Sequence, residues 1–338
     1  MNWETINLLA LLWVGIIGFG IIMYVILDGY DLGIGILSIF FRQKRDRDIM
    51  ISTILPVWDG NETWLVFGAA ALYGAFPLAF SIILPAIYIP IILMVLALLF
   101  RGVAFEFRFK AVKTRALWDY CFFGGSLVAT LVQGLILGTF VQGFDMTKTN
   151  GQMLTMQAWF NPFSIFCAIA LTFGYMLLGS NRLIEKTTGS LQNTCFYISE
   201  FTQYIILLSV ICVSLWSPNL DPAIWQRWFN PKLMPFLAIL PLLTLILLAT
   251  HWWALKKRKE KLPFWCSIGI FVMCYLGFGI STFPYLVPRQ ITYTQAASNS
   301  SALLFMLIGT IIMMPPLLYY TYYSYKIFKG KVTEKIDY

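Results

Sequence analysis

Nine apolar segments follow one another along the chain, and each is long enough to cross a lipid bilayer. The hydrocarbon core of a bilayer is about 30 Å thick, so a spanning helix needs about 20 apolar residues. Of the 338 residues, 59% are hydrophobic and only 12% are charged, whereas a soluble domain has about 25% charged residues. The sequence therefore predicts an all-α polytopic membrane protein. We expect a single integral membrane domain over residues 1–338, with nine transmembrane helices at 6–40, 50–76, 78–101, 118–142, 162–181, 197–216, 233–255, 263–285 and 302–327.

The basic residues predict which side of the membrane each loop occupies. With the N-terminus outside, 20 of the 24 lysines and arginines lie on one side, in loops or at the ends of spans. Cytoplasmic loops carry such an excess of positive charge, and an odd number of spans then places the C-terminus in the cytoplasm. The net charge of +8 is thus typical of membrane orientation rather than of nucleic-acid binding.

The first apolar segment is unusually long. At 1.5 Å per residue, a helix of 35 residues extends about 52 Å, so it must tilt, bend or protrude from the membrane. Glycines stand at positions 29, 33 and 35 of this segment. We expect either an irregularity of the helix there or the close approach of another backbone.

Few residues of this chain are suited to binding metal or haem. The one histidine, His251, lies beside Trp252 and Trp253, which predicts an interfacial position rather than a haem ligand. A bis-histidine haem or a multi-histidine metal site cannot come from this chain alone. None of the six cysteines forms a CxxC pair, so no metal site is predicted.

Four acids in the apolar segments are the candidate functional residues. Asp28 and Asp31 are three residues apart and share one helix face if the helix continues. Asp59 and Glu62 repeat this spacing on the next span, and Arg101 at the end of the third span can reach the same region. Charged groups inside spans are costly and usually mark ion or proton routes. The sequence therefore predicts a buried carboxylate cluster with a neighbouring cation.

Such a cluster is suited to carrying protons. Burial and a neighbouring cation act on a carboxyl group in opposite directions, which favours proton exchange near neutral pH. Asn61 and Thr63 would extend the hydrogen-bonded chain. A structural interpretation stays open, because Asp59 and Glu62 also have the spacing of an acidic N-cap and its N3 partner. The two acids of the first span would then pair with basic loop residues.

The segment Arg101–Arg108 alternates aromatic and charged residues at a predicted membrane boundary. This pattern favours an interfacial anchor with a Glu–Arg pair. The alternative is a contact with a partner subunit or a lipid headgroup.

Three motifs together resemble subunit II of the cytochrome bd quinol oxidases. They are Asp28–Gly35 (DGYDLGIG), Trp58–Leu65 (WDGNETWL) and Arg101–Arg108 (RGVAFEFR). Their order, their spacing and the nine-span plan are similar over essentially the whole chain. The tryptophan–aspartate–glycine–asparagine motif is the specific one, and the Arg-Gly-Val form looks more like the cyanide-insensitive branch.

The resemblance implies a subunit of a bacterial terminal oxidase in the cytoplasmic (inner) membrane, with a periplasmic N-terminus. Such complexes oxidise a membrane quinol and reduce dioxygen to water with protons from the cytoplasm, without pumping. Haems b and d are expected on the partner, the haem-bearing subunit I, and no cofactor is expected on this chain, although some members hold a structural quinone. The implied fold is two four-helix bundles plus one peripheral helix, in a pseudo-symmetric heterodimer with subunit I. A small accessory subunit, membrane lipid and quinone are further expected partners.

The resemblance also implies roles for individual residues. Asp59 matches the proton-route carboxylate, and Asp31 and Asp28 match the acids of the glycine-rich motif. Glu62 is the fourth proton-route candidate, and Arg101 matches a cation at the subunit interface. No residue is expected to be catalytic, and the chain alone is not expected to be an enzyme.

Two other functions remain open. One is a secondary transporter that couples to protons through the same four acids, a class that often has inverted repeats and broken helices. The other is a purely structural assembly subunit, in which the acids only pair with Arg101 and the basic loops.

Overall fold

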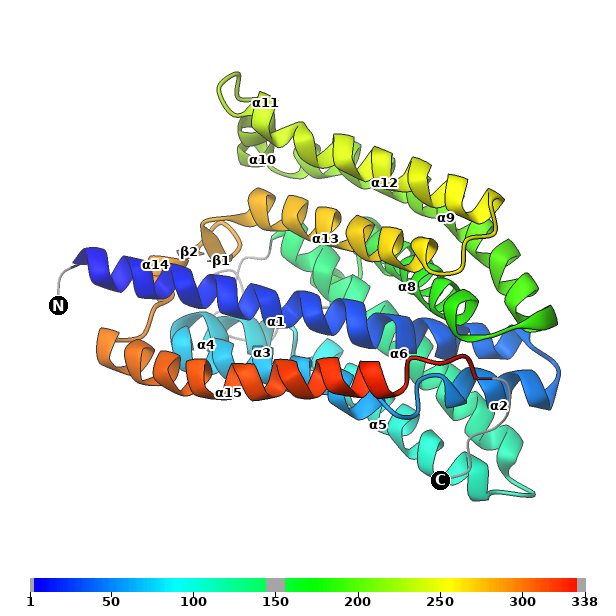
Figure 1. Ribbon diagram of the computed structural model, residues 1–338. Helices are drawn as coiled ribbons and strands as arrows, with labels where there is room; N and C mark the ends of the chain where they lie inside the picture. The colour runs from blue at the N-terminus through cyan, green and yellow to red at the C-terminus, as the bar shows by residue number, and fades with distance from the viewer. Residues whose placement is uncertain (1–2, 144–155, 333–338) are drawn as a thin grey trace.

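The protein is built from helices that run roughly side by side, as a computed structural model of residues 3–143 and 156–332 shows (Figure 1). The only strands in those residues form a two-stranded antiparallel hairpin, β1 with β2. The elements are α1 (Trp3–Leu37), η1 (Ser38–Phe40), α2 (Lys44–Ser52), α3 (Trp58–Ala75), α4 (Pro77–Ala86), α5 (Tyr88–Lys110), α6 (Arg115–Gln142), α7 (Met156–Trp159), α8 (Pro162–Lys186), α9 (Gly189–Leu220), α10 (Pro222–Trp228), α11 (Met234–Leu237), α12 (Ile239–Lys256), α13 (Leu262–Thr282), β1 (Tyr285–Val287), β2 (Ile291–Thr292), α14 (Tyr293–Ala296) and α15 (Ser300–Ile327).

Eight helices within the described residues are long and apolar enough to cross a membrane. These candidate spans correspond to α1, α5, α6, α8, α9, α12, α13 and α15. The predicted span 50–76 corresponds to α3, which is not among the eight because its 18 residues include Asp59, Asn61 and Glu62. The all-α polytopic class is therefore confirmed.

Three predicted segments differ from the observed elements. Residues 50–57 belong to α2 and to a turn, so α3 begins only at Trp58. The predicted span 78–101 is divided at Ile87, whose φ of −113° and ψ of 23° interrupt the helix between α4 and α5. The predicted span 263–285 ends at Thr282, and the hairpin that follows it was not predicted.

The glycine-rich segment of α1 permits close helix packing and does not break the helix. The expected irregularity is wrong, because α1 is a continuous helix of 35 residues. The other expectation, the close approach of another backbone, is confirmed. A Cβ atom on Gly33 would lie 1.8 Å from the backbone oxygen of Tyr175, and one on Gly179 would lie 2.7 Å from the backbone of Gly33. Glycine at these positions lets the backbones of α1 and α8 meet.

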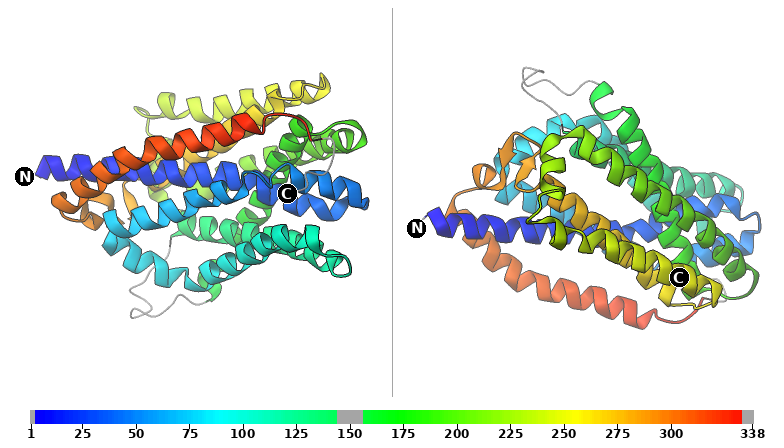
Figure 2. Two further views of the ribbon diagram at one scale, coloured as in Figure 1. Left: turned by 60° about the horizontal axis from the view of Figure 1, so that its bottom comes forward. Right: turned by 90° about the horizontal axis from the view of Figure 1, so that it is seen from above.

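The helix α1 occupies the centre of the molecule and packs against α3, α6, α8 and α15. Helices α8, α9, α12 and α13 contact one another on one side (Figures 1 and 2). A large apolar core surrounds Tyr30, Phe105 and Leu183, and a second one surrounds Trp13 and Phe76. Helix α15 lies at the outer edge beside α1, with most of its apolar surface exposed.

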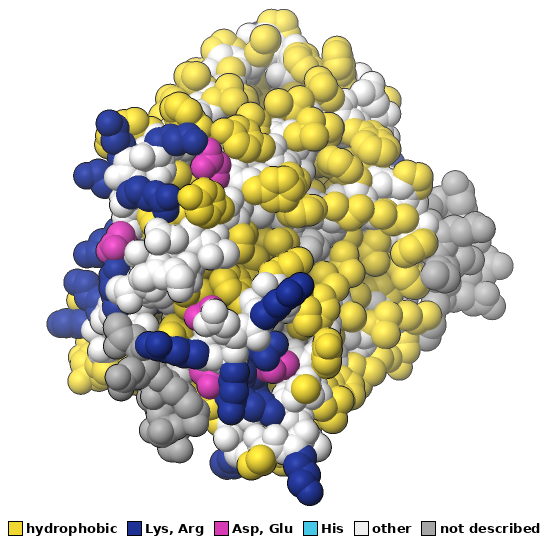
Figure 3. Space-filling model, turned by 90° about the vertical axis from the view of Figure 1, so that its right-hand side faces the viewer, with side chains coloured by type: hydrophobic (Ala, Val, Ile, Leu, Met, Phe, Trp, Pro, Cys, Tyr) yellow, Lys and Arg dark blue, Asp and Glu magenta, His cyan; other side chains and the backbone are white. Residues whose placement is uncertain are grey.

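The basic loops gather at one end of the helices. The segments 42–47, 108–115 and 256–261 join helix ends that lie at the right of Figure 1. A view onto that end shows many lysine and arginine side chains over one part of the surface and mostly hydrophobic side chains over the rest (Figure 3). Lysine and arginine side chains thus gather at this end of the helices, which we call the basic end.

Candidate functional site: a carboxyl–guanidinium cluster inside the bundle

Arg101 on α5 lies at the centre of the candidate site. Its side chain is fully buried, and its Nη1 atom donates to Oδ1 of Asp28 on α1 at 2.6 Å. Its Nη2 atom donates to Oε1 of Glu62 on α3. Asp28 is fully buried, whereas the side chain of Glu62 is 26% exposed. One guanidinium therefore links an interior carboxyl group to a carboxyl group that reaches the outer face of α3.

The cluster lies within the helices rather than at their basic ends. Arg101 precedes the end of α5 at Lys110 by nine residues, and Asp28 precedes the end of α1 at Leu37 by the same number. At 1.5 Å per residue, both lie about 14 Å from the basic end of their helix. The pairing of Asp28 with loop residues is therefore wrong, because its partner is Arg101 at the same depth.

Asp31 forms the second part of the site, one turn further along α1. It is fully buried, and its Oδ2 atom accepts a hydrogen bond of 2.8 Å from Nδ2 of Asn61. Its Oδ1 atom is buried and has no hydrogen-bond partner within residues 3–143 and 156–332. A buried oxygen of this kind is unusual and calls for a functional explanation. The prediction that Asn61 joins the network is confirmed.

Asp59 does not join the buried cluster. Its side chain is exposed in the first turn of α3, and no ion pair of Asp59 occurs among the described residues. Thr63 donates only to the backbone oxygen of Asp59, at 3.1 Å. The capping interpretation is also wrong, because the N-cap of α3 is Val57 and makes no side-chain bond. An acid in the first turn still interacts favourably with the helix dipole.

Arg108 makes contacts that the sequence did not predict. It is fully buried and donates to Asp48 on α2 at 2.8 Å and to Asp119 on α6. Arg115 also donates to Asp48. The predicted Glu–Arg pair within Arg101–Arg108 does not occur among the described residues, because Arg101 and Arg108 pair with acids outside this segment and Glu106 is exposed. This second ionic cluster joins three helices at the basic end.

His251 is buried in the bundle, and its predicted interfacial position is wrong. Its Nδ1 atom lies 2.5 Å from Oε1 of Gln203, and its Nε2 atom lies 2.8 Å from Nδ2 of Asn181. The amide nitrogen can only donate and the amide oxygen can only accept, so the ring carries its proton on Nδ1. Both ring nitrogens are engaged, and His251 therefore does not fit the role of a haem ligand in this arrangement.

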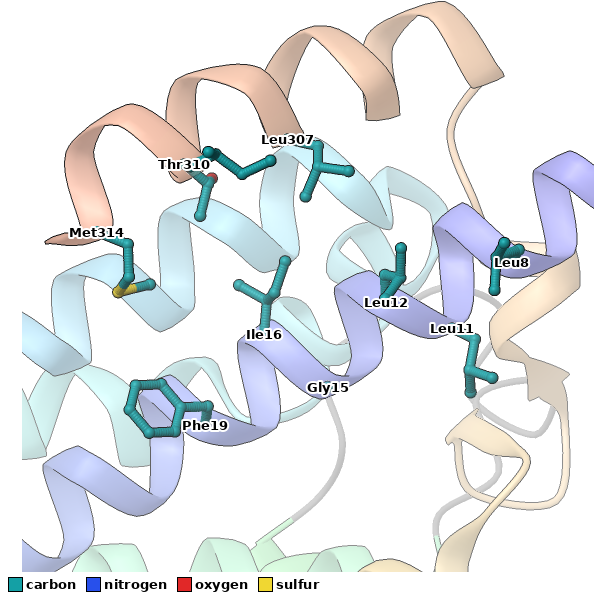
Figure 4. Close-up of a pocket in the computed structure, with 10 residues that line it drawn as sticks. Leu8, Leu11, Leu12, Gly15, Ile16, Phe19, Leu307, Thr310 and Met314 are labelled. Atoms are coloured by element: carbon teal, nitrogen blue, oxygen red, sulfur yellow. The ribbon is translucent and has the colours of Figure 1, made fainter.

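The described residues hold no group of three or more His, Cys, Asp or Glu side chains that could hold a metal ion. A groove of 490 Å³ lies between α1 and α15 on the apolar surface (Figure 4). It has one hydroxyl group and no ionisable side chain. Its lining residues are Leu8, Leu11, Leu12, Gly15, Ile16, Phe19, Leu307, Thr310, Ile311 and Met314.

Sequence reasoning missed three residues of the site. They are Tyr30, Arg182 and Tyr325, which lie close together near Asp31 and Asn61. Tyr325 is 295 positions from Tyr30, and no local pattern predicts such a pairing. The signal for Asn61 was its position between two acids on α3.

The fold and the site define a multi-pass membrane protein with a buried carboxyl–guanidinium cluster. The family model described as cytochrome bd terminal oxidase subunit II matches residues 9–328. The chain therefore belongs to the cytochrome bd oxidase subunit II family, and so to the subunits of an oxidoreductase complex in the bacterial inner membrane.

Individual relatives are similar over nearly their whole length. The cytochrome bd ubiquinol oxidase subunit 2 of Bacillus subtilis is 27% identical, with 96% of this chain and 97% of the relative covered. The cytochrome bd-I ubiquinol oxidase subunit 2 of Escherichia coli K12 is 26% identical, with coverage of 97% and 96%. A chain in the structure of the bd oxidase from Geobacillus thermodenitrificans has the same fold. It aligns with a TM-score of 0.76 and 18% identity, covering 92% of this chain and 96% of that one.

Proposed function

We propose that this chain is the haem-free subunit II of a cytochrome bd-type quinol oxidase and that it supports the haem-bearing subunit I. Membership of the subunit II family supports this function. The engagement of both ring nitrogens of His251 supports a chain without haem ligands of its own. Haems b and d then reside on subunit I, where quinol oxidation and dioxygen reduction take place.

We propose nine spans, the eight long apolar helices together with α3. Helix α3 has polar residues only in its first turns and is apolar from Leu65 onward. The contacts of α8, α9, α12 and α13 fit one four-helix bundle. Helices α1, α3, α5 and α6 would form the second bundle, with α15 as the peripheral helix. The basic end would face the cytoplasm and the N-terminus the periplasm, because positive charge gathers on the cytoplasmic side.

The acid cluster would contribute part of the proton route to subunit I. The observation that carries this proposal is the position of Arg101 between fully buried Asp28 and partly exposed Glu62. Carboxyl groups take up and release protons, whereas a guanidinium group stays charged at physiological pH. Arg101 would therefore hold the two carboxyl groups in place and balance their charge without carrying the proton itself.

Each acid would then have its own part in the route. Glu62 and the exposed Asp59 lie on the outer face of α3 and would exchange protons with water or with groups of subunit I. Asp28 and Asp31 are fully buried and would extend the route into the bundle. The resemblance further implies a structural quinone and an accessory subunit in some members, and we assign no residue of this chain to either.

The variant Asp31→Asn in the assembled complex tests the proton route. Asparagine keeps the shape of the side chain and an acceptor for Asn61 but cannot take up a proton. We expect slower oxygen consumption with full haem content. The matched control is Asp221→Asn, which makes the same chemical change in the ion pair of Asp221 with Arg289, at 2.6 Å. Unchanged turnover in a fully assembled Asp31→Asn complex would show that Asp31 is not on the route.

A proton-coupled transporter that uses the same acids has no observation in its favour. The family to which the chain belongs is one of oxidase subunits. The outer face of α3, where Asp59 is exposed and Glu62 is partly exposed, fits a subunit contact. Co-purification of a haem-bearing partner with the tagged chain separates the two functions, because a transporter needs no such partner.

A further inference from the structure

The side chain of Asn61 belongs to a closed ring of hydrogen bonds with two tyrosines. The hydroxyl oxygens of Tyr30 on α1 and Tyr325 on α15 are 2.5 Å apart. The Tyr325 hydroxyl donates to Oδ1 of Asn61 at 2.9 Å, and Nδ2 of Asn61 donates to the Tyr30 hydroxyl at 3.1 Å. Three helices that are far apart in the sequence thus meet at one side chain.

The direction of each bond in this ring follows from the acceptors around Asn61. Three acceptors share the two hydrogens of its Nδ2 atom: Oδ2 of Asp31, the Tyr30 hydroxyl and, at 3.3 Å, the backbone oxygen of Leu27, which can only accept. The amide nitrogen must therefore face α1, and the amide oxygen must face Tyr325. Because Tyr325 donates to that oxygen, the hydroxyl hydrogen between the two tyrosines comes from Tyr30. Both hydroxyl hydrogens are used inside the ring.

The ring has a consequence for Asp31. With its amide orientation fixed, Asn61 presents an N–H group to Oδ2 of Asp31 at 2.8 Å. An amide N–H donates a hydrogen bond but does not pass its proton on under physiological conditions. Oδ2 is therefore held by a fixed donor, while Oδ1 is buried without a partner in the described part of the chain.

Helix α15 is held near its C-terminal end by contacts around the ring. The Cζ atom of Arg182 on α8 lies 5.3 Å from the ring centre of Tyr30 and 5.5 Å from that of Tyr325. Beyond α15, the backbone N–H of Val332 donates to the backbone oxygen of Lys186 at 2.8 Å. Most of α15 is exposed, so these contacts help to hold the C-terminal end of the helix, and with it the Tyr325 hydroxyl, in place.

We propose that Tyr325 and Tyr30 are positioning residues that fix the amide of Asn61 and so make Oδ1 of Asp31 the atom that takes up and releases the proton. This assignment rests on the proposed function, in which Asp31 is part of the proton route. It adds an atom to that route, and it gives the C-terminal helix a part in the geometry of the site.

The first test is Tyr325→Phe in the assembled oxidase. This change removes the donor to Oδ1 of Asn61, so that oxygen loses its partner and the amide is no longer held in place against Asp31. We expect a several-fold loss of turnover and a shift of the infrared carboxyl bands that Asp31→Asn identifies in reduced-minus-oxidised spectra. The matched control is Tyr323→Phe, the same change on the same helix at a side chain that is 48% exposed. It should leave turnover and the Asp31 bands unchanged.

The second test is the double variant Tyr325→Phe/Asp31→Asn. An asparagine at position 31 takes up no proton, so the placement of Asn61 no longer affects proton transfer there. If Tyr325 acts through Asp31, its removal should have no further effect on turnover in the Asp31→Asn background. A merely structural role of Tyr325 predicts the same additional loss in both backgrounds, and that result would overturn the proposal.

The infrared measurement separates this proposal from the proposed function. Unchanged turnover in Asp31→Asn refutes the proton route, and with it the assignment of Oδ1. If turnover falls in Asp31→Asn but the Asp31 bands stay unmoved in Tyr325→Phe, the proton route stands and the positioning role of the tyrosines is refuted.

Discussion

The contact between α1 and α8 gives a prediction whose magnitude follows from one distance. In the variant Gly33→Ala, the new Cβ atom would lie 1.8 Å from the backbone oxygen of Tyr175. A close carbon–oxygen contact is about 3.3 Å, so the two backbones would have to move apart by about 1.5 Å. Backbone atoms cannot rotate away as a flexible side chain does.

The expected cost exceeds the benefit of alanine in a helix. Replacing glycine by alanine inside a helix stabilises it by about 1 kcal/mol, whereas overpacking a close contact costs about 1–3 kcal/mol or more. Gly15 lies on the same helix and has nothing within 4 Å of its would-be Cβ atom, so Gly15→Ala is the matched control. We expect Gly33→Ala to be less stable than Gly15→Ala by about 2 kcal/mol or more.

The same shift should reach the acid cluster. Gly33 is two residues from Asp31, whose hydrogen bond to Asn61 is 2.8 Å long, and contacts beyond about 3.5 Å are no longer hydrogen bonds. Misplacement by about 1 Å can lower a rate about a hundredfold, and we expect at least tenfold slower oxygen consumption. The assays are the thermal midpoint of the haem absorbance and the turnover of the purified complex. Equal midpoints and equal rates for Gly33→Ala and Gly15→Ala would refute this reasoning.

Three further predictions concern ion pairs and the histidine network. Arg101→Gln should destabilise the complex by about 3–5 kcal/mol, because it leaves Asp28 buried without its cation. Adding Asp28→Asn should restore part of the lost thermal midpoint, and a further fall of the midpoint in this double variant would contradict the pairing. His251→Phe should lower the free energy of unfolding by about 1–3 kcal/mol, and with it the thermal midpoint, because the amides of Asn181 and Gln203 lose their partner. Each assembled complex should keep its full haem spectrum; loss of one haem per complex would contradict the haem-free assignment. A hydrogen bond from Lys331 lowers the pKa of Glu260 below its usual 4.5. This pair therefore stabilises the C-terminal segment above pH 4.5, and the stabilisation is lost as the pH falls through the lowered pKa. In the wild type, hydrogen exchange at residues 328–332 should become faster in that acidic range, and in Lys331→Met it should be fast at all pH values. Exchange that does not depend on pH in the wild type would contradict this prediction.

The parts of the fold that follow from local composition could be predicted from the sequence. Long apolar runs indicate the spanning helices, and the spacing of Asp28 and Asp31 places both on one face of α1. Arg101 was correctly placed near them, because a buried carboxyl group needs a cation and few cations lie within the apolar segments. The bounds of helix α3 were harder to predict, because its polar first turns shorten its apolar stretch and because α2 and a turn precede it.

What could not be predicted depends on contacts between distant segments. Nothing near Tyr325 in the sequence indicates that its hydroxyl meets Asn61, because the pairing depends on how α15 lies along α1 and α3. His251 was expected at the interface because tryptophans follow it, yet its partners Asn181 and Gln203 are on other helices. Asp59 has the most specific motif around it, but the side on which a first-turn residue points is decided by the packing of α3.

The most direct test of the buried carboxyl groups as a proton route is to time proton uptake in a single turnover with dioxygen. The purified complex in detergent, with a pH indicator in the medium, is compared in the wild type and in Asp31→Asn at equal haem content. We predict that proton uptake in Asp31→Asn is slowed and that the final oxygen intermediate decays at the same reduced rate. Proton uptake at the wild-type rate in the variant would contradict a route through this cluster and would leave the chain a structural subunit.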